Sequence, residues 1–124
     1  MADVLALVDD LFFQAKMSET ARHVGVTLQT VASGDALAAA IAKDAPRLVL
    51  VDLNARQGAL QALQNLQAAG NTLPVIAFLS HVQTELAQQA TAAGAQRVLP
   101  RSKFTMEMAE IFRQAKAEQT EARP

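Results

Sequence analysis

The chain alternates short, continuous apolar runs with longer amphipathic segments. In one such run, residues 48–51 are all apolar and lead directly into Asp52. A run of this length without alternation is typical of a strand buried on both faces, as in a parallel sheet covered by helices. The first run has the same form, because residues 4–8 lead into Asp9 and Asp10. Both runs therefore predict buried strands that carry acidic residues at their carboxyl ends.

The rest of the pattern predicts further elements of both kinds. Besides the two runs above, strands are predicted at residues 26–32, 73–79 and 96–99. Apolar positions with helical spacing predict helices at residues 11–24, 35–43, 59–69 and 82–93, and from a cap at Ser102 to about residue 118. The polar tail at residues 119–124 is predicted to fray. Strict alternation of strands and helices predicts an α/β fold, a doubly wound five-stranded parallel sheet with five helices on its two faces.

Composition and charge narrow the class of protein. A chain of 124 residues with 51% apolar residues suits one domain with a substantial core, so residues 1–124 are predicted to form a single domain. The absence of cysteine excludes disulfides and thiolate chemistry. A net charge of −1 gives no electrostatic footprint for nucleic acid. No apolar run approaches the ~20 residues that span a bilayer, and the first residues lack the basic region of a signal peptide. We expect a cytoplasmic protein with no nucleic-acid or membrane partner.

The acidic residues are the candidate chemistry. Parallel strands end at the same edge of a sheet, where open α/β sheets bind ligands, so Asp9, Asp10 and Asp52 are expected to lie close together. Carboxylates in such a cluster repel one another unless a cation or a proton neutralises them. Oxygen ligands of this kind suit Mg²⁺. The alternative to a binding site is a purely structural role, in which the aspartates, and Ser80 after the fourth strand, cap helices or form turns.

These motifs, taken together, resemble the response-regulator receiver family over nearly the whole chain. The resemblance rests on Asp9-Asp10 after the first strand, Asp52 after the third, Ser80 after the fourth and Gly94-Ala95 before the fifth. It implies a flavodoxin-like sheet with the strand order 2-1-3-4-5.

The resemblance also implies roles for individual residues. Asp52 would accept a phosphoryl group from a histidine kinase or a phosphotransfer protein, and Ser80 would contact a phosphoryl oxygen. Mg²⁺ would be bound by Asp9, Asp10, Asp52 and the backbone carbonyl of Asn54.

Three features depart from the family pattern. Arg101 stands where the family has a lysine; it keeps the positive charge, but a planar guanidinium is not equivalent to a compact ammonium. The resemblance implies that Arg101 would contact the phosphoryl group, with Lys103 as the alternative cation for that role. Val98 stands where the family usually has an aromatic residue, and the loop after Asp52 is shorter and lacks the usual Met-Pro.

The predicted function is that of a stand-alone receiver domain, not an enzyme, in phosphorelay signal transduction. No output domain fits in the chain, so the signal would pass to a downstream protein partner. The departures favour an alternative, a pseudo-receiver that works as an interaction module without phosphorylation. A lower-ranked alternative is a small phosphohydrolase with Asp52 as nucleophile, although the chain has Asp52-Leu53-Asn54 in place of Asp-x-Asp. The oligomeric state is left open.

Two neighbouring aromatic residues predict a surface feature. Phe12 and Phe13 are consecutive, so both cannot face the core from one helix. One of them is expected to be exposed and is a candidate for contact with a partner.

Overall fold

Strands and helices alternate along the whole described chain. The computed structural model describes residues 2–56, 58–80 and 84–121. Within them the elements follow in the order β1 (Val4–Leu7), α1 (Leu11–Val24), β2 (Leu28–Val31), α2 (Gly34–Lys43), β3 (Leu48–Asp52), α3 (Ala59–Ala68), β4 (Val75–Leu79), α4 (Thr84–Ala92), β5 (Arg97–Pro100) and α5 (Arg101–Glu121). The predicted alternation is therefore confirmed.

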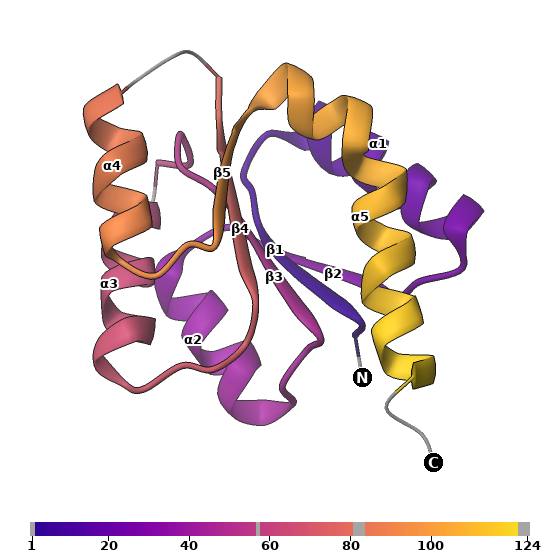
Figure 1. Ribbon diagram of the computed structural model, residues 1–124, viewed down its shortest axis with the longest axis horizontal. Coiled ribbons are helices and arrows are strands. Elements are labelled where there is room, and N and C mark those ends of the chain that lie inside the picture. Colours follow the sequence, from indigo (N-terminus) through magenta and orange to yellow (C-terminus); the bar gives the residue numbers. More distant parts are fainter. Residues whose placement is uncertain (1, 57, 81–83, 122–124) are drawn as a thin grey trace.

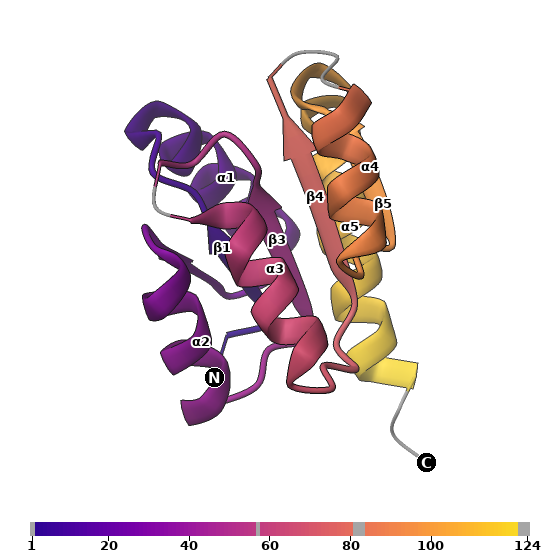
Figure 2. The ribbon, with the colours of Figure 1, turned by 90° about the vertical axis from the view of Figure 1, so that its left-hand side faces the viewer.

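The strands form one parallel sheet whose order, β2-β1-β3-β4-β5, confirms the predicted topology. Helices α1 and α5 lie on one side of the sheet, and α2, α3 and α4 lie on the other (Figure 1; Figure 2 shows the second group in front of the strands). Because every strand runs in the same direction, the carboxyl ends of β1, β3, β4 and β5 lie at one edge, which is at the top in Figure 1. This edge is where a doubly wound sheet binds ligands.

The core consists of two apolar layers, one on each face of the sheet. Val4, Ala6 and Val8 belong to the layer under α1 and α5, whereas Leu5 and Leu7 belong to the layer under α2, α3 and α4. Successive side chains of a strand point to opposite faces. A strand that is covered on both sides must therefore be apolar at every position, which explains the unbroken apolar runs.

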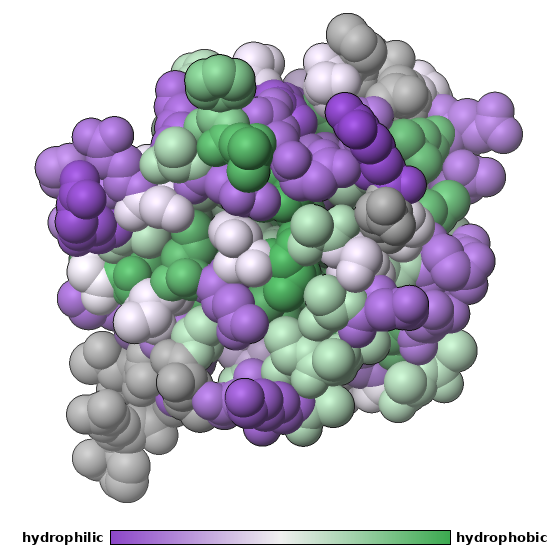
Figure 3. All heavy atoms as spheres, turned by 180° about the vertical axis from the view of Figure 1, so that it is seen from behind, coloured by the Kyte–Doolittle hydropathy of each residue, from purple (hydrophilic) through white to green (hydrophobic). Residues whose placement is uncertain are grey.

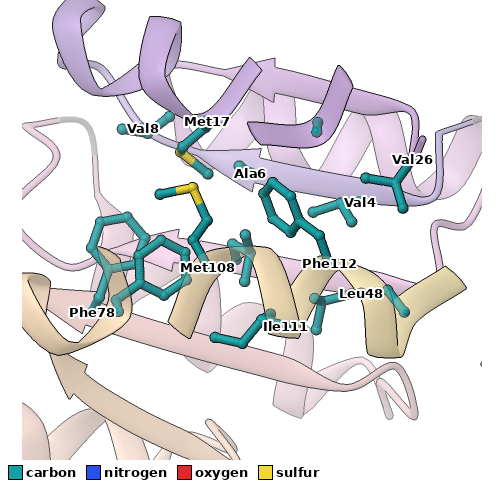
Figure 4. Packing of buried hydrophobic residues seen from close by; sticks show 14 of the residues in the cluster. Val4, Ala6, Val8, Met17, Val26, Leu48, Phe78, Met108, Ile111 and Phe112 are labelled. Atoms are coloured by element: carbon teal, nitrogen blue, oxygen red, sulfur yellow. The ribbon is translucent and has the colours of Figure 1, made fainter. Parts of the chain in front are cut away.

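Three aromatic rings form the end of the core nearest to the carboxyl edge. The rings of Phe78 and Phe104 are stacked with their centroids 4.4 Å apart, and the Phe13 ring is tilted against Phe78 at 5.3 Å. Figure 4 shows Phe78 in the same apolar cluster as Met108 and Phe112 of α5. The rings join α1, β4 and α5 directly below the loops of the carboxyl edge.

The boundaries of α5 differ from the prediction at both ends. The helix begins at Arg101, one residue before the expected cap at Ser102, because β5 ends at Pro100 and passes into the helix without a loop. It continues to Glu121, beyond the point at which fraying was expected. The residues of this last turn are mostly alanine, glutamate and glutamine, which favour a helix. Residues 122–124 and the predicted start of the fourth helix at residue 82 lie outside the described residues.

The surface confirms the expectation for the aromatic pair. Phe13 is buried, and Phe12 is 91% exposed. On the face seen in Figure 3, hydrophobic surface is divided among hydrophilic side chains and does not form one broad band. In the part of the chain that the structure describes, no helix has the length and apolar character that crossing a membrane requires.

The aromatic end of the core can be tested by truncation. Phe104→Ala removes a fully buried ring from the stack with Phe78. We expect it to lower the free energy of unfolding by about 3–5 kcal/mol, the range for a large aromatic residue changed to alanine in a core. Urea denaturation measures the change. Met106→Ala, on the same helix but 85% exposed, is the matched control, with an expected change within about 0.5 kcal/mol. Equal losses in the two variants would contradict the assignment of Phe104 to the core.

Candidate functional site

Asp52 is the centre of the site. It ends β3, lies opposite Phe78 of β4 in the sheet and is 1% exposed. Among the described residues no other charged or polar residue is buried. Its Oδ1 accepts a hydrogen bond from the backbone N–H of Asn54 at 2.9 Å. A carboxylate is thus held below the protein surface, where an unpaired charge is costly.

Asp10 joins the site from the start of α1. Its Oδ1 accepts a hydrogen bond of 3.1 Å from the backbone N–H of Phe13, so Asp10 is the N-cap of the helix. Its second carboxylate oxygen is left for another partner. The capping role considered for the acidic pair is therefore real, and it places a carboxylate at the carboxyl edge.

Arg101 connects the two carboxylates. Its Nη1 donates to Asp10 Oδ2 at 3.0 Å, and its Nη2 donates to Asp52 Oδ2 at 2.8 Å. These distances are typical of charge-assisted hydrogen bonds from the fork of a guanidinium. The cation is in the acidic cluster, while Lys103, the alternative, is exposed.

Aromatic rings hold the face of the same guanidinium. Arg101 Cζ lies 4.6 Å from the centroid of the Phe13 ring and 5.9 Å from that of Phe78, which are cation–π distances. The Arg101 side chain is 25% exposed. Its Nε is buried and has no hydrogen-bond partner among the described residues. The guanidinium is thus held by two carboxylates, and its Cζ lies over the Phe13 ring.

The other predicted residues tie loops together. Asp9 Oδ2 accepts a hydrogen bond of 2.9 Å from the backbone N–H of Arg56 in the loop after β3. The side-chain oxygen of Asn54 accepts from the backbone N–H of Ser80, which follows β4. Ser80 itself is exposed. From the sequence, Asn54 was predicted to contribute only its backbone carbonyl, as a metal ligand. The hydrogen bond between its side chain and Ser80 was not predicted. Short polar residues after two adjacent strands could have indicated such a bond.

The residues as placed do not fit a divalent cation. Asp9, Asp10 and Asp52 each accept hydrogen bonds from protein donors, and Arg101 lies between two of the three. Across residues 2–56, 58–80 and 84–121, no three acidic or histidine side chains are grouped to hold a metal ion. The donor atoms are of the type that Mg²⁺ prefers, but a guanidinium takes the position between the acids.

The two carboxylates that share Arg101 have opposite pKa shifts. Burial raises the pKa of Asp52 above its ordinary value, and the nearby Asp9 and Asp10 charges add to this; the Asn54 N–H and Arg101 offset part of the increase. The hydrogen bond from the Phe13 N–H, and after it the one from Arg101, lowers the pKa of Asp10. The two pKa shifts have opposite directions because water still reaches the Asp10 carboxylate, whereas the Asp52 carboxylate is desolvated by burial.

Comparison with known proteins agrees with this fold. The model of the response regulator receiver domain family matches residues 4–113, so the chain belongs to that family, as the sequence motifs indicated. A comparison with curated protein sequences gives no match.

Solved structures of receiver domains share the fold. The receiver domain of NtrX from Brucella abortus is 24% identical with a TM-score of 0.75, and the match covers 90% of this chain and 98% of that one. A response regulator receiver protein from Pseudoalteromonas atlantica is 19% identical with a TM-score of 0.79, covering 94% of this chain and 98% of that one. In a longer NtrX structure from Brucella abortus, 25% identical with a TM-score of 0.75, the match covers 96% of this chain but only 28% of that one.

The contribution of Arg101 to stability is measurable. Arg101→Met leaves Asp10 and Asp52 without their shared cation. We expect the free energy of unfolding at neutral pH to fall by about 1–3 kcal/mol, between the values for exposed and fully buried ion pairs. Arg113→Met is the matched control, because Arg113 lies on the same helix and pairs with Glu110 at the surface. A loss in Arg101→Met no larger than in the control would show that the pairing adds nothing to stability.

The raised pKa of Asp52 predicts a pH dependence. The unfolded chain ionises aspartate near pH 3.9, and the folded protein ionises Asp52 at a higher pH. Asp52 therefore stabilises the fold most below about pH 4 and progressively less as the pH rises through its folded-state pKa. Asp52→Asn lacks this dependence. Denaturation of both proteins from pH 3 to 8 should show the stability of the wild type, relative to the variant, falling as the pH rises. An increase would mean that Arg101 outweighs burial.

Proposed function

We propose that this receiver domain takes part in phosphorelay signalling, with Asp52 as the phosphoryl acceptor. The observation that carries the proposal is the position of Asp52: a buried carboxylate at the carboxyl end of the central strand, with a guanidinium 2.8 Å from Oδ2. A phosphoryl group brings several negatively charged oxygens. The fork of Arg101 can bind such oxygens in a bidentate manner.

The chemistry proposed for Asp52 is the formation of an acyl phosphate. An ionised carboxylate oxygen of Asp52 attacks phosphorus, an O–P bond forms, and the bond from phosphorus to the donor group breaks with its electron pair going to that group. Arg101 then exchanges its hydrogen bond to Asp52 for one to a phosphoryl oxygen. Asp52 is 1% exposed, so a donor reaches it only after the loops and Arg101 have moved.

A second candidate function is an interaction module that is not phosphorylated. It is favoured by one observation, the engagement of both Asp10 and Asp52 by Arg101. In this case the ion pairs of Arg101 with Asp10 and Asp52 would be a permanent structural feature. The predicted Mg²⁺ would then have no role.

Under either candidate the signal leaves the domain through contact with another protein. Leu11 and Phe12 directly follow Asp10 and are both exposed. Their position next to the site makes them candidates for that contact. The proposed phosphoryl source is a histidine kinase or a phosphotransfer protein, and a cytoplasmic location is part of the proposal.

Phosphorylation is tested with a small acyl phosphate as donor, in the presence and in the absence of Mg²⁺. We expect the intact mass to increase by one phosphoryl group, and we expect Asp52→Asn to show no increase. Asp35→Asn, which changes an exposed aspartate at the start of α2, is the control and should behave like the wild type. Free phosphate is measured in parallel, because steady turnover would indicate the phosphohydrolase alternative.

The Arg101→Lys variant separates the two candidate functions. An ammonium cannot bridge the acids with two nitrogens, so Asp52 should be more accessible and phosphoryl uptake should increase. If neither the wild type nor this variant gains mass, the interaction module is the better description.

A further inference from the structure

We infer that Arg101 is the built-in cation of the acidic site and replaces a divalent metal ion there, so that the resting site does not depend on metal. The inference concerns the resting protein and does not require that Asp52 be phosphorylated. It follows from two observations: the carboxylate oxygens of the site are of the type that suits Mg²⁺, but the guanidinium of Arg101 lies between Asp10 and Asp52.

The acidic cluster requires a balancing positive charge. The cluster contains Asp9, Asp10 and Asp52, and such a group needs positive charge nearby. Arg101 supplies it by direct contact with two of the three acids, at 3.0 and 2.8 Å. The third, Asp9, uses Oδ2 to accept the Arg56 N–H at 2.9 Å and so faces a different partner.

Arg101 is anchored beside the acids by its helix and by an aromatic ring. Arg101 is the first residue of α5, and its guanidinium rests on the Phe13 ring, with Cζ 4.6 Å from the centroid. It is therefore always present at high effective concentration, unlike an ion in solution. A divalent ion that took the Oδ2 atoms of Asp10 and Asp52 from Arg101 would leave two guanidinium nitrogens without acceptors over an aromatic surface. Such a loss of partners is costly in a partly buried site.

The shape of the guanidinium suits this pair of carboxylates. A guanidinium presents separate nitrogens to the two carboxylates, whereas a lysine ammonium is a single point of charge on a flexible stem. Two carboxylates from different elements are bridged here by Nη1 and Nη2 of one side chain. Lysine has one terminal nitrogen and cannot reproduce this two-nitrogen bridge, and removing the bridge should free oxygens that suit a hard divalent ion.

The test is thermal unfolding in EDTA and in millimolar Mg²⁺ or Mn²⁺ at constant ionic strength. The wild type should show the same melting temperature in all three conditions. Arg101→Met should melt at a lower temperature in EDTA, and a divalent ion should raise it by roughly 5 °C, because an ion that binds only the native state stabilises it. Arg113→Met, the matched control on α5, should behave like the wild type. Titration calorimetry with Mn²⁺ measures binding directly on the same proteins.

Two results would overturn the inference. Mn²⁺ binding and a melting shift in the wild type as large as in Arg101→Met would show that metal and Arg101 coexist. An absence of binding in both proteins would show that the acids do not form a cation site that Arg101 replaces. If Arg101→Met fails to fold, Arg101→Lys takes its place in the same assays, with metal binding again expected. No phosphoryl donor is used, so failure of the proposed phosphorylation is a separate outcome.

Discussion

The bridge from one guanidinium to two carboxylates is the interaction on which the carboxyl edge of the sheet depends. Arg101 follows β5, whereas Asp52 ends β3 and Asp10 follows β1, so the side chain must extend across the end of β4. The residue of β4 at this level is Phe78, which lies opposite Asp52. An apolar ring there gives the long arginine side chain a surface to lie on and offers no competing acceptor. The length of arginine and the aromatic floor are therefore two parts of one arrangement.

The same aromatic floor connects the site to the core. Phe13 and Phe78 lie under the guanidinium and also pack against Phe104 inside the sheet–helix layer. Apolar surroundings strengthen a satisfied ion pair and penalise an unsatisfied charge. This explains how Asp52 can have a raised pKa while it is hydrogen-bonded to an arginine. Burial disfavours the charged form, and the pair compensates for only part of that cost. A substitution of Arg101 should consequently alter the packing of Phe13 and Phe78 in the core as well as the ion pairs at the site.

The fold could be predicted from the sequence because a strand that is buried on both faces must be apolar at successive positions, as residues 48–51 are. The proximity of Asp10 and Asp52 was also predictable, since parallel strands end at a common edge. The partners of individual oxygens were not. Asp9 accepts from the Arg56 N–H, and the Asn54 side chain accepts from the Ser80 N–H. Such choices depend on the path of each loop and on side-chain rotamers, which no periodicity in the sequence encodes. For the same reason the sequence could not decide between Arg101 and Lys103.

A cation and an anion that enter the site have different effects on the hydrogen bonds of Arg101 to Asp10 and Asp52. A cation that enters the cluster competes with Arg101 for the same oxygens of Asp10 and Asp52, and one of the two cations must lose its partners. An anion has the opposite effect. Phosphoryl oxygens on Asp52 could accept hydrogen bonds from the same Nη atoms, so Arg101 would exchange one anionic partner for another and keep its place over Phe13. Replacement of the family lysine by arginine thus suits the proposed phosphoryl acceptor, and it supports our inference that Arg101 takes the place of a metal ion. Only the anion can enter without leaving a buried charge unpaired.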